Sequence, residues 1–260
     1  MSPDLCMRDV YGEALLALAE QFPEMVVLDA DVSSSTRTAA FGKKYPHRFF
    51  NVGVAEAGMV DMAAGMATCG LRPIVNTFAL FLALKTGDQI RNVVCYNNLP
   101  VILAGAYAGL SDSYDGASHQ SITDIGFMRS MPNLVVIVPG DATEILPALE
   151  YALRRNGPTF IRTCRNPTPV LSQKQAGIFD VTKVRMLREG TNLTIAATGI
   201  PVFMAVQAAE KLATRGISVE VLEVPMIKPM DASMTINSGD PAQNISSRKR
   251  PFTILLRVAP

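Results

Sequence analysis

The sequence has few of the features that mark a membrane, secreted or nucleic-acid-binding protein. Residues 1–22 carry Asp, Arg and Glu where a signal peptide needs an uninterrupted apolar core, and no stretch reaches the ~18 consecutive apolar residues of a membrane span. Lysine and arginine number 24 against 23 aspartates and glutamates, and the body of the chain has no basic run. We therefore expect a protein that associates with neither a membrane nor nucleic acid.

Cysteine and histidine are also scarce. The four cysteines are widely spaced and form no C-x-x-C pair, which fits reduced thiols, mostly in a core, in a cytoplasmic protein. They are Cys6, Cys69, Cys95 and Cys164. Of the two histidines, His47 lies in a basic turn with no evident role, whereas His119 lies in a polar loop beside Asp115.

Apolar runs of strand length alternate with segments of helical periodicity from residue 5 to residue 166. We expect strands at 25–28, 49–52, 72–77, 101–104, 134–138 and 158–162, and helices at 7–22, 55–70, 79–96, 122–131 and 141–154. Strands that alternate with helices predict an α/β fold with a doubly wound, mostly parallel sheet. We assign residues 1–170 to this first domain.

A second, shorter α/β unit follows. Residues 171–190 read as an extended linker, and the pattern strand, helix, strand recurs at 192–197, 201–215 and 218–224. We therefore expect a partial second domain over 191–231. Residues 232–260 are polar and irregular for most of their length, so we expect a flexible tail there.

The helix expected over 55–70 is apolar or small on every side except at Glu56 and Asp61. A helix that is hydrophobic all round belongs in an interior or a subunit interface. Glu56 would then be a buried carboxylate in the first helical turn, where backbone amides stabilise negative charge. A capping acid is the plain interpretation. The alternative is a carboxylate that binds a ligand.

Phe78 and Phe81 follow one βα unit later and lie three residues apart, hence on one helical face. An aromatic pair at this spacing is usually part of a core. Together with a buried carboxylate, the pair could also form a slot for a flat heterocycle whose ring nitrogen needs a proton partner.

The loop from 105 to 118 is long and polar, and a loop of that length within a compact domain is usually functional or disordered. It ends in Asp115-Gly116-Ala117-Ser118-His119-Gln120. Asp115 and His119 can address a hydroxylated ligand. Helix capping by Ser118 and a structural hydrogen bond at His119 are the alternatives.

Two further strand ends carry polar residues. The strand at 25–28 is followed by Asp29, Asp31 and a cluster of serines that includes Ser35, at the edge where open α/β sheets bind ligands. A solvated loop with a helix cap explains the same residues. After the strand at 158–162, we expect Arg162 to be a plain surface charge.

Four ordered motifs together resemble the pyrimidine-binding domain of transketolases, and the likeness runs from about residue 5 to residue 231. They are G-V-A-E-A-G-M at 53–59, T-F-A-L-F at 77–81, D-Q-I-R at 88–91 and D-G-A-S-H-Q at 115–120. Several motifs in order are more specific than any one alone. The second unit is similar to the opening of the carboxy-terminal domain of that family.

The resemblance implies a role for each matching residue. Glu56 would bond the aminopyrimidine of thiamine diphosphate and favour its reactive tautomer, with Phe78 and Phe81 stacked on the ring. Asp31 would also lie near the cofactor. Asp115 and His119 would contact sugar hydroxyls, with His119 also moving a proton. Ser35 and Arg165 would lie at a substrate phosphate, Arg165 through its planar fork of donors.

Two positions depart from the family pattern. Tyr107 stands where full-length transketolases often have a histidine, and Leu84 stands where they often have a tyrosine after the aromatic pair. Tyr107 would change the contacts to the substrate phosphate. Leu84 would weaken one of the stacking surfaces around the cofactor ring.

The chain lacks the Gly-Asp-Gly turn with which the family holds diphosphate and its metal. We therefore assign no metal ligand to this chain and expect a second polypeptide to hold Mg²⁺ and the diphosphate. The family occurs as one long chain or as two shorter ones. This chain resembles the carboxy-terminal subunit of a split transketolase, which implies self-association and binding to an N-terminal subunit, as in a heterotetramer.

The implied reaction is the transfer of a two-carbon ketol unit between sugar phosphates. Alternatives are an enzyme like 1-deoxyxylulose-5-phosphate synthase, one like the beta subunit of a 2-oxoacid dehydrogenase, and a non-catalytic interaction subunit. The motif at 115–120 and the segment Arg162-Thr163-Cys164-Arg165 favour the transketolase, because a sugar phosphate gives these groups something to bind.

Overall fold

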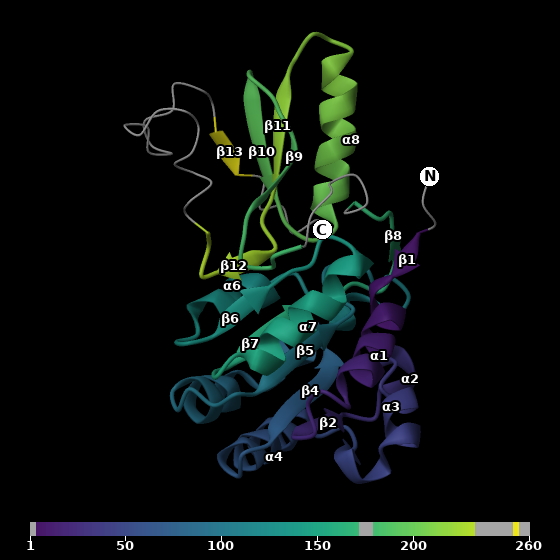
Figure 1. Cartoon of the computed structure of the whole chain (residues 1–260), viewed down its shortest axis with the longest axis vertical. Coiled ribbons are helices and arrows are strands. Elements are labelled where there is room, and N and C mark those ends of the chain that lie inside the picture. The colour runs from purple at the N-terminus through teal and green to yellow at the C-terminus, as the bar shows by residue number, and fades with distance from the viewer. Residues whose placement is uncertain (1–3, 172–178, 232–251, 255–260) are drawn as a thin grey trace.

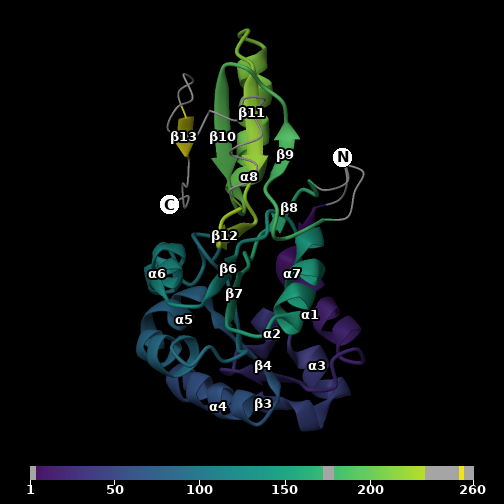
Figure 2. The same ribbon diagram turned by 60° about the vertical axis from the view of Figure 1, so that its left-hand side comes forward.

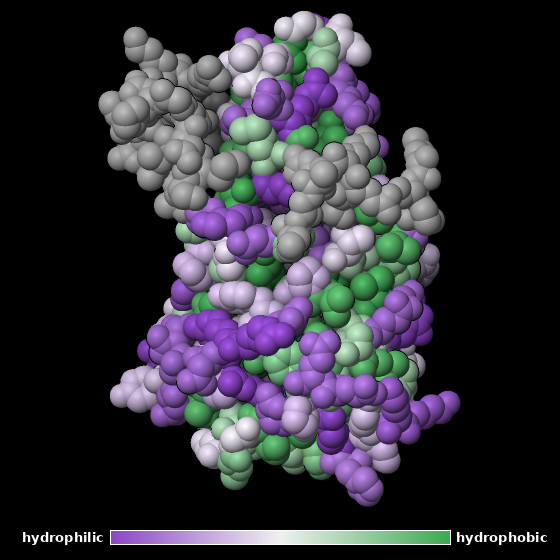
Figure 3. Space-filling view, viewed as in Figure 1, coloured by the Kyte–Doolittle hydropathy of each residue, from purple (hydrophilic) through white to green (hydrophobic). Residues whose placement is uncertain are grey.

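The structure of the chain is a computed structural model that describes residues 4–171, 179–231 and 252–254. Two α/β units are stacked along the long axis of the molecule, the larger one below in Figure 1. On the face seen in Figure 3, hydrophilic and hydrophobic side chains are interspersed over the larger unit. Such mixing is normal for a protein surface.

The larger unit is built on one sheet in the order β12-β6-β7-β5-β4-β2-β3. Its neighbours pair in parallel, except that β12 runs antiparallel to β6 at one edge. The predicted mostly parallel sheet is thus confirmed. The strands are β2 (Met25–Asp29), β3 (Phe49–Asn51), β4 (Arg72–Phe78), β5 (Ile102–Ala106), β6 (Val135–Ile137), β7 (Thr159–Arg162) and β12 (Met226–Lys228).

Helices cover both faces of this sheet. The set α4, α5 and α6 lies on one side and the set α1, α3 and α7 on the other (Figure 2), each over its own buried apolar cluster. The sheet is therefore doubly wound. The helices are α1 (Met7–Leu18), α2 (Ser33–Thr36), α3 (Ala39–Lys44), α4 (Glu56–Thr68), α5 (Ala79–Lys85), α6 (Asp124–Ser130) and α7 (Ile145–Arg154).

Shorter elements complete this unit. β1 (Leu5–Cys6) pairs antiparallel with β8 (Pro167–Thr168), so the two ends of the first domain meet. Short 3₁₀ turns occur at Pro46–Arg48, Ala117–His119 and Ala142–Glu144.

The helix expected over 79–96 is interrupted. α5 ends at Lys85, and a wider π-helical segment, Gln89–Cys95, follows. Thr86 forms the break, and at the next residue, Gly87, a Cβ atom would lie 2.6 Å from the ring of Phe127. The contact between this glycine and α6 explains why the helical pattern does not continue as one helix. It also makes Lys85 the last residue of α5.

The smaller unit has a four-stranded sheet in the order β13-β10-β11-β9, with one helix. Its elements are β9 (Arg185–Arg188), β10 (Leu193–Ala197), α8 (Pro201–Ala213), β11 (Val219–Glu223) and β13 (Phe252–Ile254). β9 lies within the expected linker and pairs antiparallel with β11, because Met186 and Leu187 pack against the cores on either side. Most of the expected tail, 232–260, lies outside the described residues.

Candidate active site

The carboxyl ends of neighbouring parallel strands bring polar and aromatic residues to one edge of the larger sheet. β2 ends at Asp29, β4 at Phe78, β5 at Ala106 and β7 at Arg162, and these strands are adjacent in the order β7-β5-β4-β2. Open α/β sheets bind their ligands at this edge. The site residues expected from the sequence lie on the loops and helices that begin here.

Glu56 begins α4 and is buried, as expected from the sequence. Both of its carboxylate oxygens accept a hydrogen bond from Lys85 Nζ, each at 3.0 Å. The Glu56 side chain is 5% exposed, whereas that of Lys85 is 50% exposed. The sequence analysis did not identify Lys85. The acid is therefore almost out of contact with solvent, whereas its lysine partner is half-exposed.

Four rings surround the end of β4. Phe78 stacks on Tyr107 at 4.8 Å between centroids and lies 5.8 Å from Phe81. The ring of His119 stands edge-on to Phe78 at 5.6 Å and to Phe81 at 5.1 Å. The structure thus joins the aromatic pair to His119, and it gives Tyr107 a stacking role. Lys85 Nζ lies 4.5 Å from the Phe81 centroid, which connects the ring cluster to Glu56.

His119 lies in the 3₁₀ turn Ala117–His119, with Ser118 Oγ 3.1 Å from its Nδ1. Since Nδ1 has this partner, Nε2 is the nitrogen left for a ligand. Asp115 is exposed at the start of the same turn. Both of these expected hydroxyl contacts therefore lie on one short segment beside the aromatic rings.

Arg165 pairs with Asp112, a buried carboxylate that the sequence analysis did not single out. Burial, followed by the nearby Asp115, raises the pKa of Asp112. The Arg165 guanidinium also lies over two aromatic rings, 5.1 Å from the centroid of Tyr107 and 5.0 Å from that of Tyr114. Some of the guanidinium N–H donors that were expected to bind a phosphate therefore already donate to Asp112.

Arg8, on the first turn of α1, is a further residue that the sequence analysis missed. Its Nη1 donates to the hydroxyl of Tyr107 at 2.5 Å, and it forms no salt bridge with any described residue. Its Nε is buried and has no hydrogen-bond partner among the described residues. A partly buried cation in this state favours a nearby anion. A local sequence pattern could not reveal it, because Arg8 and Tyr107 are 99 positions apart.

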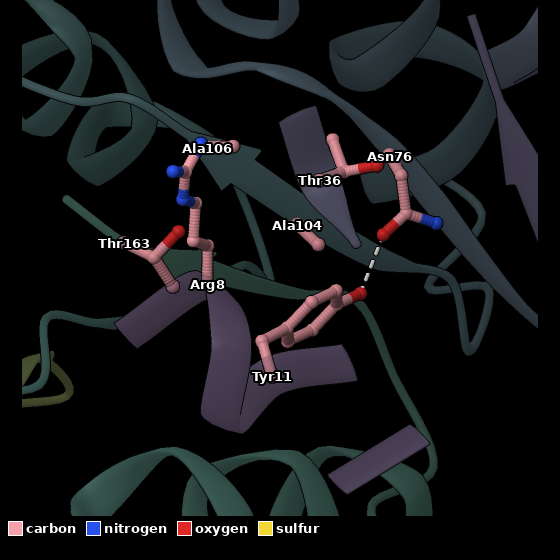
Figure 4. Close-up of a pocket in the computed structure, with 7 residues that line it drawn as sticks. All are labelled: Arg8, Tyr11, Thr36, Asn76, Ala104, Ala106 and Thr163. Atoms are coloured by element: carbon pink, nitrogen blue, oxygen red, sulfur yellow. Dashed lines mark hydrogen bonds between the residues drawn. The ribbon is translucent and has the colours of Figure 1, made fainter. Parts of the chain in front are cut away.

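A small cavity separates Arg8 from the strands of the sheet (Figure 4). Its volume is ≈ 10 Å³, close to that of a single water. In the figure, Tyr11 points towards Asn76, and its hydroxyl donates to Asn76 Oδ1 at 2.5 Å. The lining residues are Arg8, Tyr11, Thr36, Asn76, Ala104, Ala106 and Thr163.

The loop after β2 places its residues differently from the expectation. Asp29, rather than Asp31, is the buried acid, and it accepts hydrogen bonds from Val32 N at 2.7 Å and from the hydroxyls of Thr36 and Thr38, each at 2.8 Å. Burial raises the pKa of Asp29.

Asp31 and Ser35 lie in the segment that follows β2. Asp31 is exposed, has a left-handed backbone (φ 65°) and accepts a hydrogen bond from Asn51 Nδ2 at 2.9 Å. Ser35 lies on α2, and its neighbour Thr36 is the residue that lines the cavity.

Arg162 is not a plain surface charge, so that expectation was wrong. Its side chain is 10% exposed, and its Nε lies 2.6 Å from Oδ2 of Asp124, which is wholly buried. Asp124 stands at the start of α6. The packing of this helix beside the end of β7 buries the pair, and a sequence pattern could not predict that packing.

One face of α4 is open in this chain. Met59, Val60 and Ala63 pack in the core, but Gly58 and Gly65 have open space where a Cβ atom would stand. Large apolar side chains near this face are also exposed: Val54, Met62 and Leu84. The helix that was expected in an interior or a subunit interface is therefore covered on one side only by the described part of this chain.

Searches of residues 4–171, 179–231 and 252–254 for two other kinds of site gave no candidate. No group of three or more His, Cys, Asp and Glu residues in these ranges could hold a metal ion. No helix in them is long and apolar enough to cross a membrane.

Two family models match the chain. The pyrimidine-binding domain of transketolase matches residues 4–170, and the C-terminal domain of transketolase matches residues 182–245. A protein of Methanocaldococcus jannaschii named "Putative transketolase C-terminal section" is 41% identical over 90% of this chain and 74% of its own length. The 6-deoxy-6-sulfo-D-fructose transketolase subunit SqwH of a Clostridium species is 37% identical over 90% of this chain and 72% of its own length.

Longer relatives and solved structures match as well. A 1-deoxy-D-xylulose-5-phosphate synthase of Pelotomaculum thermopropionicum is 38% identical over 86% of this chain, which spans 35% of that relative. A solved split gene transketolase, described as an inactive beta4 tetramer, has a TM-score of 0.82 and 38% identity, covering 91% of this chain and 76% of its own. The transketolase of Campylobacter jejuni, at 23% identity and a TM-score of 0.80 over 86% of this chain and 36% of its own, shows a likeness of fold alone.

Proposed function

The chain belongs to the transketolase family, and on that premise we propose that it is the carboxy-terminal subunit of a two-chain transketolase. The complex would use thiamine diphosphate to transfer a two-carbon ketol unit between sugar phosphates. The observation that carries the proposal is the buried carboxylate of Glu56, which Lys85 connects to the ring of Phe81 and so to the aromatic cluster.

The residues at this edge fit the pyrimidine ring of the cofactor. Lys85 Nζ, 3.0 Å from both Glu56 oxygens, shows that a hydrogen-bond donor can reach the buried carboxylate. A ring nitrogen that shares a proton with Glu56 needs the same access. The Phe78 and Phe81 rings, at the end of β4, supply the apolar surface for a flat ring.

Thiamine diphosphate, when bound, supplies the electron sink for cleavage of a carbon–carbon bond. In our proposal Glu56 shares a proton with the pyrimidine nitrogen. Asp115 and His119 hold hydroxyls of the sugar, and His119 Nε2 moves a proton at the substrate oxygen. The hydrogen bond between Ser118 and Nδ1 supports this assignment, because a ring nitrogen with a fixed partner sets the tautomer of the other.

We propose that the phosphate end of the sugar lies near Arg8 and Arg165. Arg8 forms no salt bridge with a described residue, and both Arg8 and Arg165 lie against the Tyr107 ring, 5.7 Å and 5.1 Å from its centroid. Ser35, one residue from the cavity-lining Thr36, remains a proposed phosphate contact. Asp31 remains a proposed residue of the cofactor surroundings.

A partner chain would hold the diphosphate and Mg²⁺, since this sequence has no Gly-Asp-Gly turn. The solved split gene transketolase described as an inactive beta4 tetramer supports this division. We propose that the open face of α4, with Gly58 and Gly65, packs on a second copy of this chain and that N-terminal subunits complete a heterotetramer. The four free cysteines fit an assembly in the cytoplasm.

The test is to co-purify the chain with a candidate diphosphate-binding partner and to assay ketol transfer with and without thiamine diphosphate and Mg²⁺. We expect transfer by the mixture, dependent on the cofactor, and none by either chain alone. If this chain alone bound thiamine diphosphate with Mg²⁺ as tightly as the mixture, the proposed division of the site would be wrong.

A second candidate is an activity like that of 1-deoxyxylulose-5-phosphate synthase, because such synthases are among the relatives of this chain. A synthase of that kind takes its two-carbon unit from a 2-oxoacid and releases carbon dioxide. The same mixture should therefore be offered an aldose phosphate as acceptor together with either a ketose phosphate or a 2-oxoacid as donor. Turnover with the ketose donor but not with the 2-oxoacid supports the transketolase, the reverse supports the synthase, and turnover with neither supports a non-catalytic interaction subunit.

A further inference from the structure

Lys85 stands between solvent and two groups of the proposed cofactor site. Its Nζ is 3.0 Å from each oxygen of Glu56 and 4.5 Å from the centroid of the Phe81 ring. Lys85 is also the only hydrogen-bond partner that the described residues offer the Glu56 carboxylate. One ammonium group thus covers both the acid and the ring.

The pair is unequal in its exposure to water. The Glu56 side chain is 5% exposed and that of Lys85 is 50% exposed. A buried carboxylate is costly without a partner, whereas a lysine with a flexible four-carbon stem can return its ammonium to water. Lys85 is therefore the mobile member of the pair, and Glu56 is the fixed one.

We propose, as a step that rests on the function above, that Lys85 is a resident counter-ion which occupies the place of the cofactor ring nitrogen until the cofactor displaces it. With Lys85 bound, the Glu56 carboxylate is ionised and the ring slot is closed. Cofactor binding breaks the two Nζ–H···O bonds and forms one hydrogen bond between the ring nitrogen and Glu56. Lys85 is thus a positioning residue that controls cofactor affinity.

This exchange has a defined proton balance. Lys85 leaves as an ammonium and keeps its proton, and an aminopyrimidine nitrogen carries none at pH 7.5. The proton shared by Glu56 and the ring must then come from solvent, one for each molecule bound. Without Lys85, no cation compensates the charge of the buried Glu56 carboxylate, and burial then favours its protonated form. Binding to such a chain should therefore take up fewer protons than binding to the wild type.

The experiment uses the full chain and thiamine, which lacks the diphosphate, so that no partner is needed. Calorimetric titrations at pH 7.5 in two buffers of different ionisation enthalpy give the affinity and the number of protons taken up. We expect Lys85→Met to bind thiamine about tenfold more tightly. We also expect the number of protons taken up to fall below that of the wild type.

Two further variants keep the result interpretable. Lys85→Arg retains a cation and should behave like the wild type in both measurements. Lys44→Met is the matched control, since Lys44 is 53% exposed, pairs with Glu20 at 3.6 Å and lies 5.2 Å from the Tyr45 ring centroid, but is remote from the site. It should leave both values unchanged.

The proposal is overturned if Lys85→Met gains no affinity for thiamine, including the case in which neither chain binds it, or if its proton uptake equals that of the wild type. This failure differs from failure of the proposed function. If the assembled chains transfer ketol units but Lys85→Met does not change thiamine binding, only the proposal for Lys85 is rejected. If Lys85→Met binds thiamine more tightly but the assembled chains transfer no ketol unit, only the proposed reaction is rejected.

Discussion

Two regions of the molecule pair buried carboxylates with cations that differ in their exposure to water, and the first is the junction between the two sheets. There Arg185 of β9 lies between Glu144 and Glu223, both fully buried. Its Nη2 is 2.7 Å from Glu144 Oε1 and its Nε is 2.7 Å from Glu223 Oε2. Three ionisable side chains from both units are thus held together, and only Arg185, at 16% exposure, has limited contact with water.

The second region is the carboxyl edge of the larger sheet. Glu56 and Asp112 are nearly as buried as the junction acids, but their cations, Lys85 and Arg165, are 50% and 28% exposed. Arg162, which pairs with Asp124 at the same edge, is only 10% exposed and resembles the junction cation. A cation that reaches water can exchange its carboxylate for a ligand, whereas one held between two buried carboxylates cannot. The comparison teaches that the exposure of the cation, rather than the burial of the acid, distinguishes a site from a structural ion pair.

The largest expected effect comes from removing the acid at the edge. Glu56→Gln should lower the turnover of the assembled enzyme by about a hundred- to ten-thousandfold, because an amide cannot share a proton with the ring nitrogen. The melting temperature of the chain should change little, since Gln keeps the volume and Lys85 can turn to water. Ketol-transfer assays and thermal melts measure the two effects.

Glu20→Gln is the control for this change, because Glu20 pairs with Lys44 on the surface. It should leave turnover unchanged. Near-normal ketol transfer by Glu56→Gln would remove Glu56 from its proposed role and would erase the functional difference between the two regions.

The next effect is on stability at the junction. Arg185→Met leaves two buried carboxylates without their cation and should lower the free energy of unfolding by about 3–5 kcal/mol. Arg154→Met is the control, because Arg154 and Glu150 form an exposed pair along α7 and should contribute at most about 1 kcal/mol. Urea denaturation measures both. Equal losses from the two variants would contradict the comparison.

A smaller effect concerns pH. Burial and the charge of Glu223 raise the pKa of Glu144 well above its usual value. Between the ordinary and the raised pKa, the folded chain therefore retains a proton that the unfolded chain releases. The contribution of this proton to the free energy of unfolding is complete below pH ~4.3, and it is lost as the pH rises through the pKa of Glu144 in the folded chain.

Glu144→Gln removes this titration. The urea midpoint of the variant should therefore fall less between pH 5 and pH 8 than that of the wild type. Glu150→Gln on the exposed face of α7 should keep the wild-type slope. A variant Glu144→Gln with an unchanged slope would show that the junction does not hold the extra proton.

The smallest expected effect concerns the Asp112–Arg165 pair at the carboxyl edge of the larger sheet. Asp112→Asn frees the guanidinium of Arg165 for a substrate phosphate and should lower KM for a phosphorylated sugar about threefold, with kcat unchanged. The control is Asp9→Asn, since Asp9 lies 2.6 Å from Arg37 in an exposed pair. A KM that rises in Asp112→Asn would show that Asp112 helps Arg165 to bind substrate rather than occupying it.

Local patterns in the sequence predicted the parts of the molecule that local interactions determine. Alternating apolar runs predicted the mostly parallel sheet, and the apolar helix after residue 55 placed Glu56 in a buried first turn. The spacing of Phe78 and Phe81 put both rings on one face. In each case the determining residues lie within a few positions of one another.

The missed features depend on packing between distant segments. Lys85 is 29 positions from Glu56, and Arg165 is 53 positions from Asp112. No periodicity links such residues, because the sheet order decides which loops meet. The same holds for β9, whose position was assigned to a linker because only its pairing with β11 makes it a strand.

The position of β12 has a consequence for how the protein is made. Met226–Lys228 completes the larger sheet by covering the free edge of β6. It is the last strand of that sheet to leave the ribosome, because β9, β10, α8 and β11 of the smaller unit precede it in the chain. Until then β6 presents unpaired backbone groups on which another nascent chain could pair. Folding of the first domain during translation therefore waits for the second, and a chain released before residue 226 would be prone to aggregate.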